Sequence, residues 1–359
     1  MPTSIVYIGT YTRPLEHVDG CGEGIYTIQL DHKTGAMSAL NPPVAAPNSS
    51  YLCQSRNGEH LYAIGEVYDY ANREDGCLNV FATGDALTQK QECSSTGRGP
   101  AYIRIDQSGR WLMCANYTEG NLAVYPIQKN GSLGRVNQSI QLNGSGSDTV
   151  RQDGPHPHSI VPSSDNRFVY VADLGTDQIR GYHFDAANGQ LSHDDALDLK
   201  AKPKSGPRHF IFHPNSALAY YVQELSSEVS VCRVDPLSGK LSHMQTLTTL
   251  PEDSSSISHC SEICISRDGR HLYVANRGHD SIAQFNVQPD GRLITIGHTD
   301  CLGHIPRHIC LSLDDQYLLV ANQESHQIVS FRRDASTGNL HSTQQAINIP
   351  TPGYIEFKH

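Results

Sequence analysis

A short pattern that recurs about every 50 residues constrains the fold of this chain more than any other feature. Each copy opens with Pro or Ser and continues with a run in which apolar and polar residues alternate. A turn follows, and then a second apolar run that ends at a polar residue, usually Asn or Asp. Copies open at Ser50, Pro100, Pro157, Pro207, Ser261 and Pro306. Units of this length bury their apolar faces against their neighbours, so we expect one closed array rather than separate domains.

Four strand-like runs make up each unit, as the copy that opens at Ser261 illustrates. Its runs cover residues 262–266, 271–276, 281–287 and 292–297. Asp-Gly and Asn-Gly pairs separate many such runs along the chain, and these pairs are strong signals for hairpin turns. No segment sustains a 3.6-residue period, so helices are not expected. Four antiparallel strands per unit predict the blade of a β-propeller.

The two ends of the chain each carry an incomplete unit. Residues 5–9, 24–30 and 36–40 form three strand-like runs at the N-terminus. Residues 352–357 form one run at the C-terminus, and it opens like the first strand of every other unit. We therefore predict that both ends share one blade, which closes the ring and removes the exposed sheet edge. The prediction is an all-β, seven-bladed propeller that occupies residues 1–359 as a single domain.

Composition narrows the choice of partners. The chain has 27 basic and 37 acidic residues and a net charge of -10, which argues against nucleic acid or an anionic membrane as a partner. No apolar run approaches the roughly 20 residues of a membrane helix. Residues 1–4 lack the basic region of a signal peptide, so we expect a cytoplasmic protein, either a monomer or a small homo-oligomer.

The ten cysteines are scattered along the chain, and several lie within apolar runs. In a cytosolic protein, cysteines of this kind are reduced and mostly buried. The tightest group is His259, Cys260 and Cys264, which lacks a fourth ligand at the spacing that zinc sites use. We therefore expect no metal site and no cofactor.

Strand direction predicts where the unusual polar residues meet. Antiparallel strands alternate in direction, so the loop that enters the first strand of a blade and the turn after its second strand lie on one face. The first strand lines the central channel, and polar residues at these positions therefore converge at one mouth. The candidates for substrate binding are His156, His209, Glu262, Asn276, Arg307, His308, Asn322 and Gln323, and the candidates for catalysis are His158, Arg208, Glu224 and Arg277. Arg104 and Glu66 are expected at the same mouth.

Some of these residues have an ordinary structural alternative. Asn276 and Asn322 follow second strands, where a side-chain amide often satisfies the backbone groups of a turn. His209 and His308 could instead tie one blade to the next by hydrogen bonds. The sequence leaves these alternatives open.

Three arginines, Arg208, Arg277 and Arg307, carry the clearest chemical signal. Aimed into one narrow channel, they repel one another unless anions or carboxylates lie between them. Few acids are in reach, so an anion site is favoured over a pure ion-pair network, and the guanidinium fork suits carboxylate or phosphate oxygens. His158 has the better intrinsic pKa for a general acid or base, with Glu224 as its partner. An arginine beside a reacting carbonyl would stabilise an oxyanion.

Many of these residues belong to motifs spread along the whole chain, namely Tyr7–Thr12, Pro155–His158, Ala172–Asp177, Gly206–His209, Glu224–Ser227, Leu272–His279 and Val320–Gln323. In these motifs the chain resembles the lactonase family of seven-bladed propellers, which includes bacterial 6-phosphogluconolactonase-like proteins and fungal carboxy-cis,cis-muconate cyclases. The muconate cyclase site contains one histidine, two arginines and one glutamate, which the resemblance matches to His158, Arg208, Arg277 and Glu224. The chain departs from the family in an insertion at residues 68–75, which we expect near the channel mouth.

The resemblance implies hydrolysis of a small anionic sugar lactone, most directly 6-phosphogluconolactone to 6-phosphogluconate in the pentose phosphate pathway. Within the family, the alternative is a lactone-forming cycloisomerase, in which the same arginines hold the carboxylates of a carboxymuconate-type diacid. A third possibility is a non-catalytic propeller that binds a partner protein. The arginines at the channel mouth argue against it, because a scaffold has no need to concentrate cations in a narrow pore.

Overall fold

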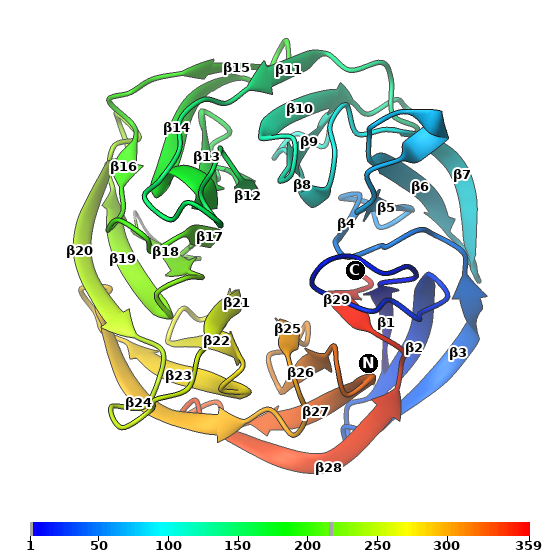
Figure 1. Cartoon of the computed structure of the whole chain (residues 1–359). Helices are drawn as coiled ribbons and strands as arrows, with labels where there is room; N and C mark the ends of the chain where they lie inside the picture. The colour runs from blue at the N-terminus through cyan, green and yellow to red at the C-terminus, as the bar shows by residue number, and fades with distance from the viewer. Residues whose placement is uncertain (1–2, 215–217) are drawn as a thin grey trace.

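The computed structural model describes residues 3–214 and 218–359, which form seven antiparallel sheets arranged radially around a central channel (Figure 1). The predicted all-β, seven-bladed propeller is confirmed. In every blade the first strand is innermost and its neighbours follow toward the rim. Within the described residues, no helix is long and apolar enough to cross a membrane.

The two inner strands of each blade lie closest to the channel. The first strands, in order around the ring, are β29 (Pro352–Phe357), β4 (Leu52–Gln54), β8 (Pro100–Ile105), β12 (Pro157–Pro162), β17 (Pro207–Phe212), β21 (His259–Ile265) and β25 (Pro306–Leu311). The second strands, in the same order, are β1 (Thr3–Thr10), β5 (His60–Gly65), β9 (Trp111–Asn116), β13 (Phe168–Asp173), β18 (Leu218–Gln223), β22 (His271–Arg277) and β26 (Tyr317–Asn322).

The two outer strands of each blade form the rim. The third strands are β2 (Ile25–Asp31), β6 (Cys77–Thr83), β10 (Asn121–Pro126), β14 (Gln178–Asp185), β19 (Glu228–Val234), β23 (Ser281–Val287) and β27 (Gln327–Arg333). The fourth strands are β3 (Met37–Val44), β7 (Leu87–Ser94), β11 (Gln138–Gln141), β15 (Gln190–His193), β20 (Leu241–Thr248), β24 (Leu293–Asp300) and β28 (Leu340–Asn348). The short strand β16 (Leu199–Lys200) also pairs with β14. Two single 3-10 turns that the sequence pattern did not predict are η1 (Tyr70–Asn72) and η2 (Leu174–Thr176).

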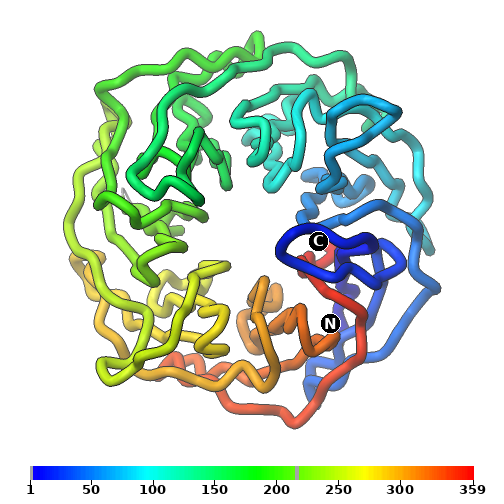
Figure 2. Tube along the Cα trace, in the orientation of Figure 1, coloured from blue at the N-terminus to red at the C-terminus, as the bar shows by residue number. Residues whose placement is uncertain are grey.

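The ends of the chain close the ring as predicted. Strand β29 from the C-terminus pairs antiparallel with β1 from the N-terminus, with Ile355 opposite Ile8 and Phe357 opposite Val6. In Figure 2 the red end of the chain accordingly lies beside the blue end. This pairing satisfies the backbone groups of β1 that would otherwise form an exposed sheet edge.

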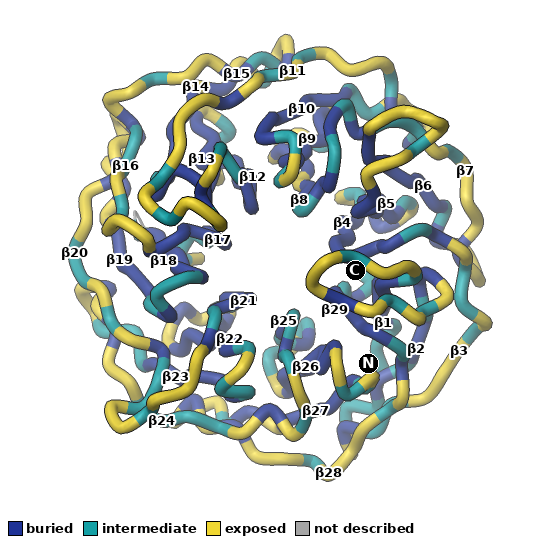
Figure 3. Tube along the Cα trace, viewed as in Figure 1, coloured by how far each residue is buried: buried dark blue, intermediate teal, exposed yellow. Residues whose placement is uncertain are grey.

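Burial decreases from the channel side of each blade to the rim (Figure 3). All residues of β9 and of β26 are buried, whereas β28 alternates little and is mostly exposed. Second strands are covered on both faces by the neighbouring blades, so both of their faces are apolar. Rings fill the space between blades, as where Tyr170 stacks on Phe210 with centroids 5.3 Å apart.

The predicted hairpin turns are confirmed, and their glycines have a physical reason. Gly338, in the turn before β28, has a φ of +79°, and a Cβ atom there would collide with the ring of His271 in the neighbouring blade. Only glycine adopts this backbone conformation at no steric cost.

A bulge on the inner strands determines which side chains face the channel. The pairing of the first with the second strand shifts register in most blades, for example between Pro207 and Phe210 of β17 and between Pro306 and His308 of β25. A regular strand sends consecutive side chains to opposite faces, and a bulge breaks this alternation. Consecutive residues such as Arg208 and His209 therefore both reach the channel mouth.

One long connection, here called the arm (residues 12–23), starts at the end of β1, lies over β29 and β1, and extends to the edge of the central channel (Figures 1 and 2). The side chain of Asn48 accepts hydrogen bonds from the backbone N–H groups of Thr12 (2.8 Å) and Arg13 (2.9 Å). Leu15 and Val18 form an isolated bridge that narrows the tip. The sequence pattern did not predict this arm.

Candidate active site

A cavity of about 790 Å³ occupies the predicted mouth of the channel. Its wall combines the ends of the inner strands with the arm and with the loop between β11 and β12. Of the predicted site residues, it brings together His156, His158, Arg208, His209, Glu224, Glu262, Arg277, Arg307 and His308. Gln323 lines a neighbouring cavity of about 550 Å³, which shares Arg277 and Arg307 with the first.

Glu224 is the electrostatic centre of the cavity. Its Oε2 atom lies 3.0 Å from Arg208 Nε and 2.9 Å from Arg277 Nη2, and its Oε1 atom lies 2.6 Å from Arg151 Nη2. Burial alone would favour the neutral carboxyl, but Arg277, Arg208 and Arg151 outweigh it and hold the pKa of Glu224 well below its usual range. Glu224 is therefore ionised and serves as the shared counter-ion of three arginines.

The cavity lining holds five arginines and five acidic residues, but around Glu224 the guanidinium groups outnumber the carboxylate. Burial, together with Arg277 and Arg307, lowers the pKa of Arg208 to about 10. Arg307 lies over the ring of Tyr11, 5.6 Å from its centroid, and has no carboxylate at ion-pairing distance among the described residues. Arg277 Nε is buried without a hydrogen-bond partner in the described chain. These guanidinium groups are suited to bind an anion or a developing oxyanion.

His158 is a neutral imidazole in this cationic setting. Its side chain is buried on β12, and its Nδ1 atom has no hydrogen-bond partner in the part of the chain described. Burial, Arg208 and His209 lower its pKa well below the usual value of 6.5. A neutral ring with an unoccupied nitrogen can accept a proton, whereas Glu224 has both oxygens occupied by arginines. This geometry favours His158 as the proton acceptor.

Glu262 joins two histidines at the base of the cavity. Its Oε1 atom lies 2.9 Å from His209 Nδ1, and its Oε2 atom lies 3.0 Å from His308 Nε2. The backbone N–H of Ile355 donates to His308 Nδ1 (3.3 Å), so the proton of this ring is on Nε2 and faces Glu262. The structural alternative is observed for His209 and His308, which connect blades through Glu262 and Ile355, and both residues also line the cavity.

The tyrosines beside this group close the channel below the cavity. The ring centroids of Tyr51 and Tyr102 lie 4.1 Å apart, as do those of Tyr51 and Tyr354, and His308 lies 3.9 Å from Tyr354. The cavity thus has a packed floor. Arg104 was expected at the channel mouth, but this prediction is wrong, because Arg104 is not part of the cavity wall. It is exposed on β8, two residues beyond Tyr102, where it interacts with Glu356.

Asn276 and Asn322 lie outside the cavity, and their structural alternative is the one observed. Asn276 is fully buried, donates to the carbonyl of Thr249 (2.8 Å) and accepts from the hydroxyl of Thr249 (2.6 Å). Asn322, also fully buried, donates to the carbonyl of Cys301 (2.8 Å). Both amides point away from the channel. Each binds its blade to the segment of chain that precedes that blade.

Sequence reasoning missed Arg151 and the arm. Arg151 belongs to the loop at residues 142–156, whose only signal is one basic residue in a Gly- and Ser-rich stretch. From the arm, His17 approaches Glu66 (3.7 Å) and meets the ring of Tyr11 edge-on. Burial and Arg307 lower the pKa of His17 to about 4. No local motif marks either segment as part of the site.

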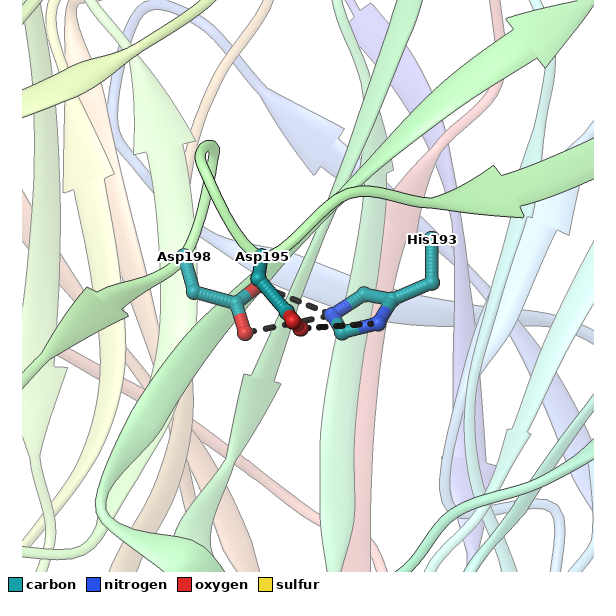
Figure 4. Close-up of side chains that lie close together, drawn as sticks. All are labelled: His193, Asp195 and Asp198. Atoms are coloured by element: carbon teal, nitrogen blue, oxygen red, sulfur yellow. Dashed lines mark hydrogen bonds and ion pairs between the residues drawn. The ribbon is translucent and has the colours of Figure 1, made fainter.

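A group of possible metal ligands lies away from the cavity, on the rim of the blade formed by β12, β13, β14 and β15. His193, Asp195 and Asp198 converge at the turn between β15 and β16 (Figure 4). Asp198 Oδ1 accepts the backbone N–H of Gly181 (2.9 Å) and lies 3.0 Å from His193 Nε2. The fourth strand of this blade is interrupted between β15 and β16, and there the carboxylate of Asp198 takes the place of a backbone acceptor for Gly181. This structural role explains why Asp198 lies beside His193. Cys260, from the predicted weak cluster, instead contacts Thr249.

Comparison with known proteins agrees with this architecture. A family model described as "Lactonase, 7-bladed beta-propeller" matches residues 5–357. The chain belongs to this family. The resemblance inferred from the sequence motifs is thereby confirmed.

Named relatives cover almost the whole chain. A 6-phosphogluconolactonase of Bacillus subtilis is 32% identical over 362 residues, which cover 100% of this chain and 99% of the relative. A 6-phosphogluconolactonase of Formosa agariphila is 35% identical over 334 residues, covering 91% of this chain and 93% of the relative. The solved structure of a periplasmic gluconolactonase of Pseudomonas aeruginosa superposes with a TM-score of 0.91 at 29% identity, covering 99% of each chain.

Proposed function

We propose that this protein is a lactonase that hydrolyses a small anionic sugar lactone, most directly 6-phosphogluconolactone to 6-phosphogluconate. The observation that carries the proposal is a buried, neutral His158, whose Nδ1 atom has no hydrogen-bond partner among the described residues, in the same cavity as the arginine cluster around Glu224. The names of the relatives agree with this substrate class. The expected place of the reaction is the pentose phosphate pathway.

The proposed reaction adds water to the lactone carbonyl. His158 accepts a proton from the water as its oxygen bonds to the carbonyl carbon. Negative charge then develops on the carbonyl oxygen, where Arg208 and Arg277 stabilise it. Collapse of the tetrahedral intermediate breaks the bond between that carbon and the ring oxygen, which takes the proton back from His158. The lowered pKa of His158 makes its protonated form a strong acid for this last step.

Glu224 has a supporting role in this proposal. Its carboxylate holds Arg208 and Arg277 side by side, which their mutual repulsion would otherwise prevent. Glu262 similarly orients His209, and the Nη1 atom of Arg208 lies 3.2 Å from Nε2 of that histidine. His156, Arg307 and His308 complete the proposed substrate-binding surface.

The test is the hydrolysis rate of freshly generated 6-phosphogluconolactone, corrected for its spontaneous opening. We expect His158→Ala to lower kcat by about 100- to 10,000-fold and Arg208→Ala by about 100- to 1,000-fold. His183→Ala and Arg167→Ala remove a histidine and an arginine from exposed ion pairs and serve as matched controls. Circular dichroism establishes that each variant is folded.

Absence of acceleration by the wild type would refute this substrate. Carboxymuconate-type diacids would then be assayed for cyclisation, because the same arginines suit the carboxylates of such a substrate. A propeller that accelerates neither reaction would have a binding role instead.

We also propose that the protein works in the cytoplasm. All ten cysteines are free thiols and most are buried, as expected where thiols are kept reduced. Fractionation of cells that express the tagged chain tests this, and recovery with periplasmic markers would contradict it.

A further inference from the structure

Arg151 makes a contact that the proposed reaction does not use. Its Nη2 atom lies 2.6 Å from Glu224 Oε1, although Arg151 belongs to a loop rather than to a strand. Its side chain is 38% exposed, compared with 3% for Arg208 and 14% for Arg277. Arg151 is therefore the outermost of the three arginines that surround Glu224.

The side chain of Arg151 is the member of the cluster that can exchange Glu224 for a substrate anion. Glu224 Oε2 remains paired with Arg208 and Arg277, so its charge stays compensated. Only the Arg151 side of this ion pair is open to water, because Arg151 is 38% exposed and Glu224 is 5% exposed, so a substrate anion can reach the guanidinium group from the outer side. The backbone of the loop need not move: Asp148 Oδ1 accepts the N–H of Arg151 (3.0 Å), and Gln152 Nε2 donates to the carbonyl of Leu174 (2.9 Å).

A phosphorylated sugar lactone requires a cation at such a position. Its phosphate is attached through the exocyclic carbon on the other side of the ring oxygen from the carbonyl, so the phosphate and the developing oxyanion are two separate anionic groups that each need a cation. Arg208 and Arg277 lie deep in the cavity beside His158, where the carbonyl is expected. Arg151 reaches the same cavity from its outer wall. The similar proteins include one named for a phosphorylated lactone and one named for an unphosphorylated lactone, so the phosphate is the group on which specificity can differ.

We propose that Arg151 exchanges Glu224 for the phosphate of the bound substrate and thereby selects phosphorylated over uncharged lactones. Arg151 is thus a specificity residue, and the inner arginines serve both substrates alike. The inference rests on the proposed lactonase function and extends it from the carbonyl to the phosphate of the substrate.

The test compares two lactones that differ only in the phosphate, 6-phosphogluconolactone and glucono-1,5-lactone. For Arg151→Ala we expect kcat/KM to fall about 10- to 100-fold on the phosphorylated lactone, mostly through KM, and less than about threefold on the uncharged one. Arg151→Lys should recover part of the loss because it keeps the charge. Arg98→Ala is the matched control, since Arg98 also lines the cavity, is 38% exposed and pairs with Glu119 (2.7 Å).

Two results would overturn the proposal. An equal loss on both lactones would mean that Arg151 only holds Glu224 in place, and no loss on either would mean that the phosphate binds elsewhere. A selective loss in Arg98→Ala instead would move the role to that residue.

Failure of the lactonase function itself is distinguishable. If the wild type hydrolyses neither lactone, calorimetric titration with 6-phosphogluconate and with gluconate decides the matter. Loss of a 6-phosphogluconate preference in Arg151→Ala would support the role of Arg151 without the reaction. An unchanged preference, or none in the wild type, would exclude it.

Discussion

A single carboxylate explains how several arginines share one cavity. Glu224 contacts three guanidinium groups, so the ion-pair network considered from the sequence exists. It does not consume all the positive charge, because Arg307 lacks a carboxylate partner in the described chain. The network and the anion site are therefore two aspects of one arrangement: Glu224 assembles the cations, and the excess charge remains available to a substrate.

The titration of His158 makes a prediction at the residue scale. Burial and the nearby Arg208 lower its pKa well below 6.5, so the ring stays neutral as the pH falls through 6.5. Glu224 likewise stays ionised below 4.5. We expect kcat/KM for lactone hydrolysis to be constant from pH 8 to below pH 6. A pH–rate profile checks this, and an acid limb with a midpoint near 6.5 would contradict the assignment of His158 as a buried general base.

The buried carboxyl group of Glu356 leads to a second prediction, which concerns the free energy of unfolding. Burial raises its pKa from 4.5 to about 7, against the effect of Arg104. The folded state therefore binds one more proton than the unfolded state between pH 4.5 and 7, and stability falls as the pH rises through this window. Glu356→Gln removes the effect and should stabilise the protein by on the order of 1–3 kcal/mol at pH 8, with little change at pH 4.5.

Urea unfolding at both pH values measures this difference, with Glu252→Gln as the control because Glu252 is exposed. A stability gain from Glu356→Gln that is the same at pH 4.5 and pH 8 would argue against a titration effect.

At the scale of elements, the inner strands position the chemistry. Their bulges place two consecutive side chains in the cavity wall, as with Arg208 and His209 on β17 or Arg307 and His308 on β25. The arginine of each pair faces the cavity: Arg208 binds Glu224, and Arg307 remains available to substrate. The histidine of each pair packs against the tyrosines of the floor. An unbulged strand would supply only one of the two.

The arm leads to a prediction at this scale. It lines both cavities through Glu16 and His17, and few of its side chains are buried. Replacing residues 14–19 with a short Gly-Ser turn should join the two cavities. We expect KM for the lactone to rise about 3- to 10-fold, kcat to change less than about threefold, and stability to fall by less than about 2 kcal/mol.

Steady-state kinetics and thermal unfolding of this variant test the prediction. A loss of kcat comparable to that of His158→Ala would show instead that the arm contributes directly to the chemical step.

For the whole molecule, closure of the ring is the decisive event. Strand β29 satisfies the edge of β1 and also brings Tyr354 to the floor of the cavity. Removing residues 352–359 should therefore expose β1 and produce a protein that aggregates or is largely unfolded. Size-exclusion chromatography and circular dichroism measure the outcome.

A synthetic peptide of residues 350–359 should restore the folded monomer by adding the missing strand in trans. A peptide with the same residues in scrambled order is the control. A truncated protein that stays monomeric with an unchanged Tm would refute the importance of closure.

The sequence by itself determined the architecture. Turn residues such as Gly338 and short apolar runs such as that of β9 act locally, so the number of blades and their closure could be predicted from the sequence pattern. Chain direction then placed most candidate residues, including His158 and Arg208, at one mouth of the channel. These predictions succeeded because they depend only on local pattern and on the direction of antiparallel strands.

Only the tertiary structure decided how the side chains are used. The amide of Asn276 turns toward a neighbouring loop, Arg104 lies beyond the cavity, and Arg151 reaches Glu224 across 73 residues of sequence. Each of these outcomes depends on contacts between segments that are distant along the chain. Local pattern encodes the strand on which a residue lies, but the packing of one blade against the next determines what its side chain touches.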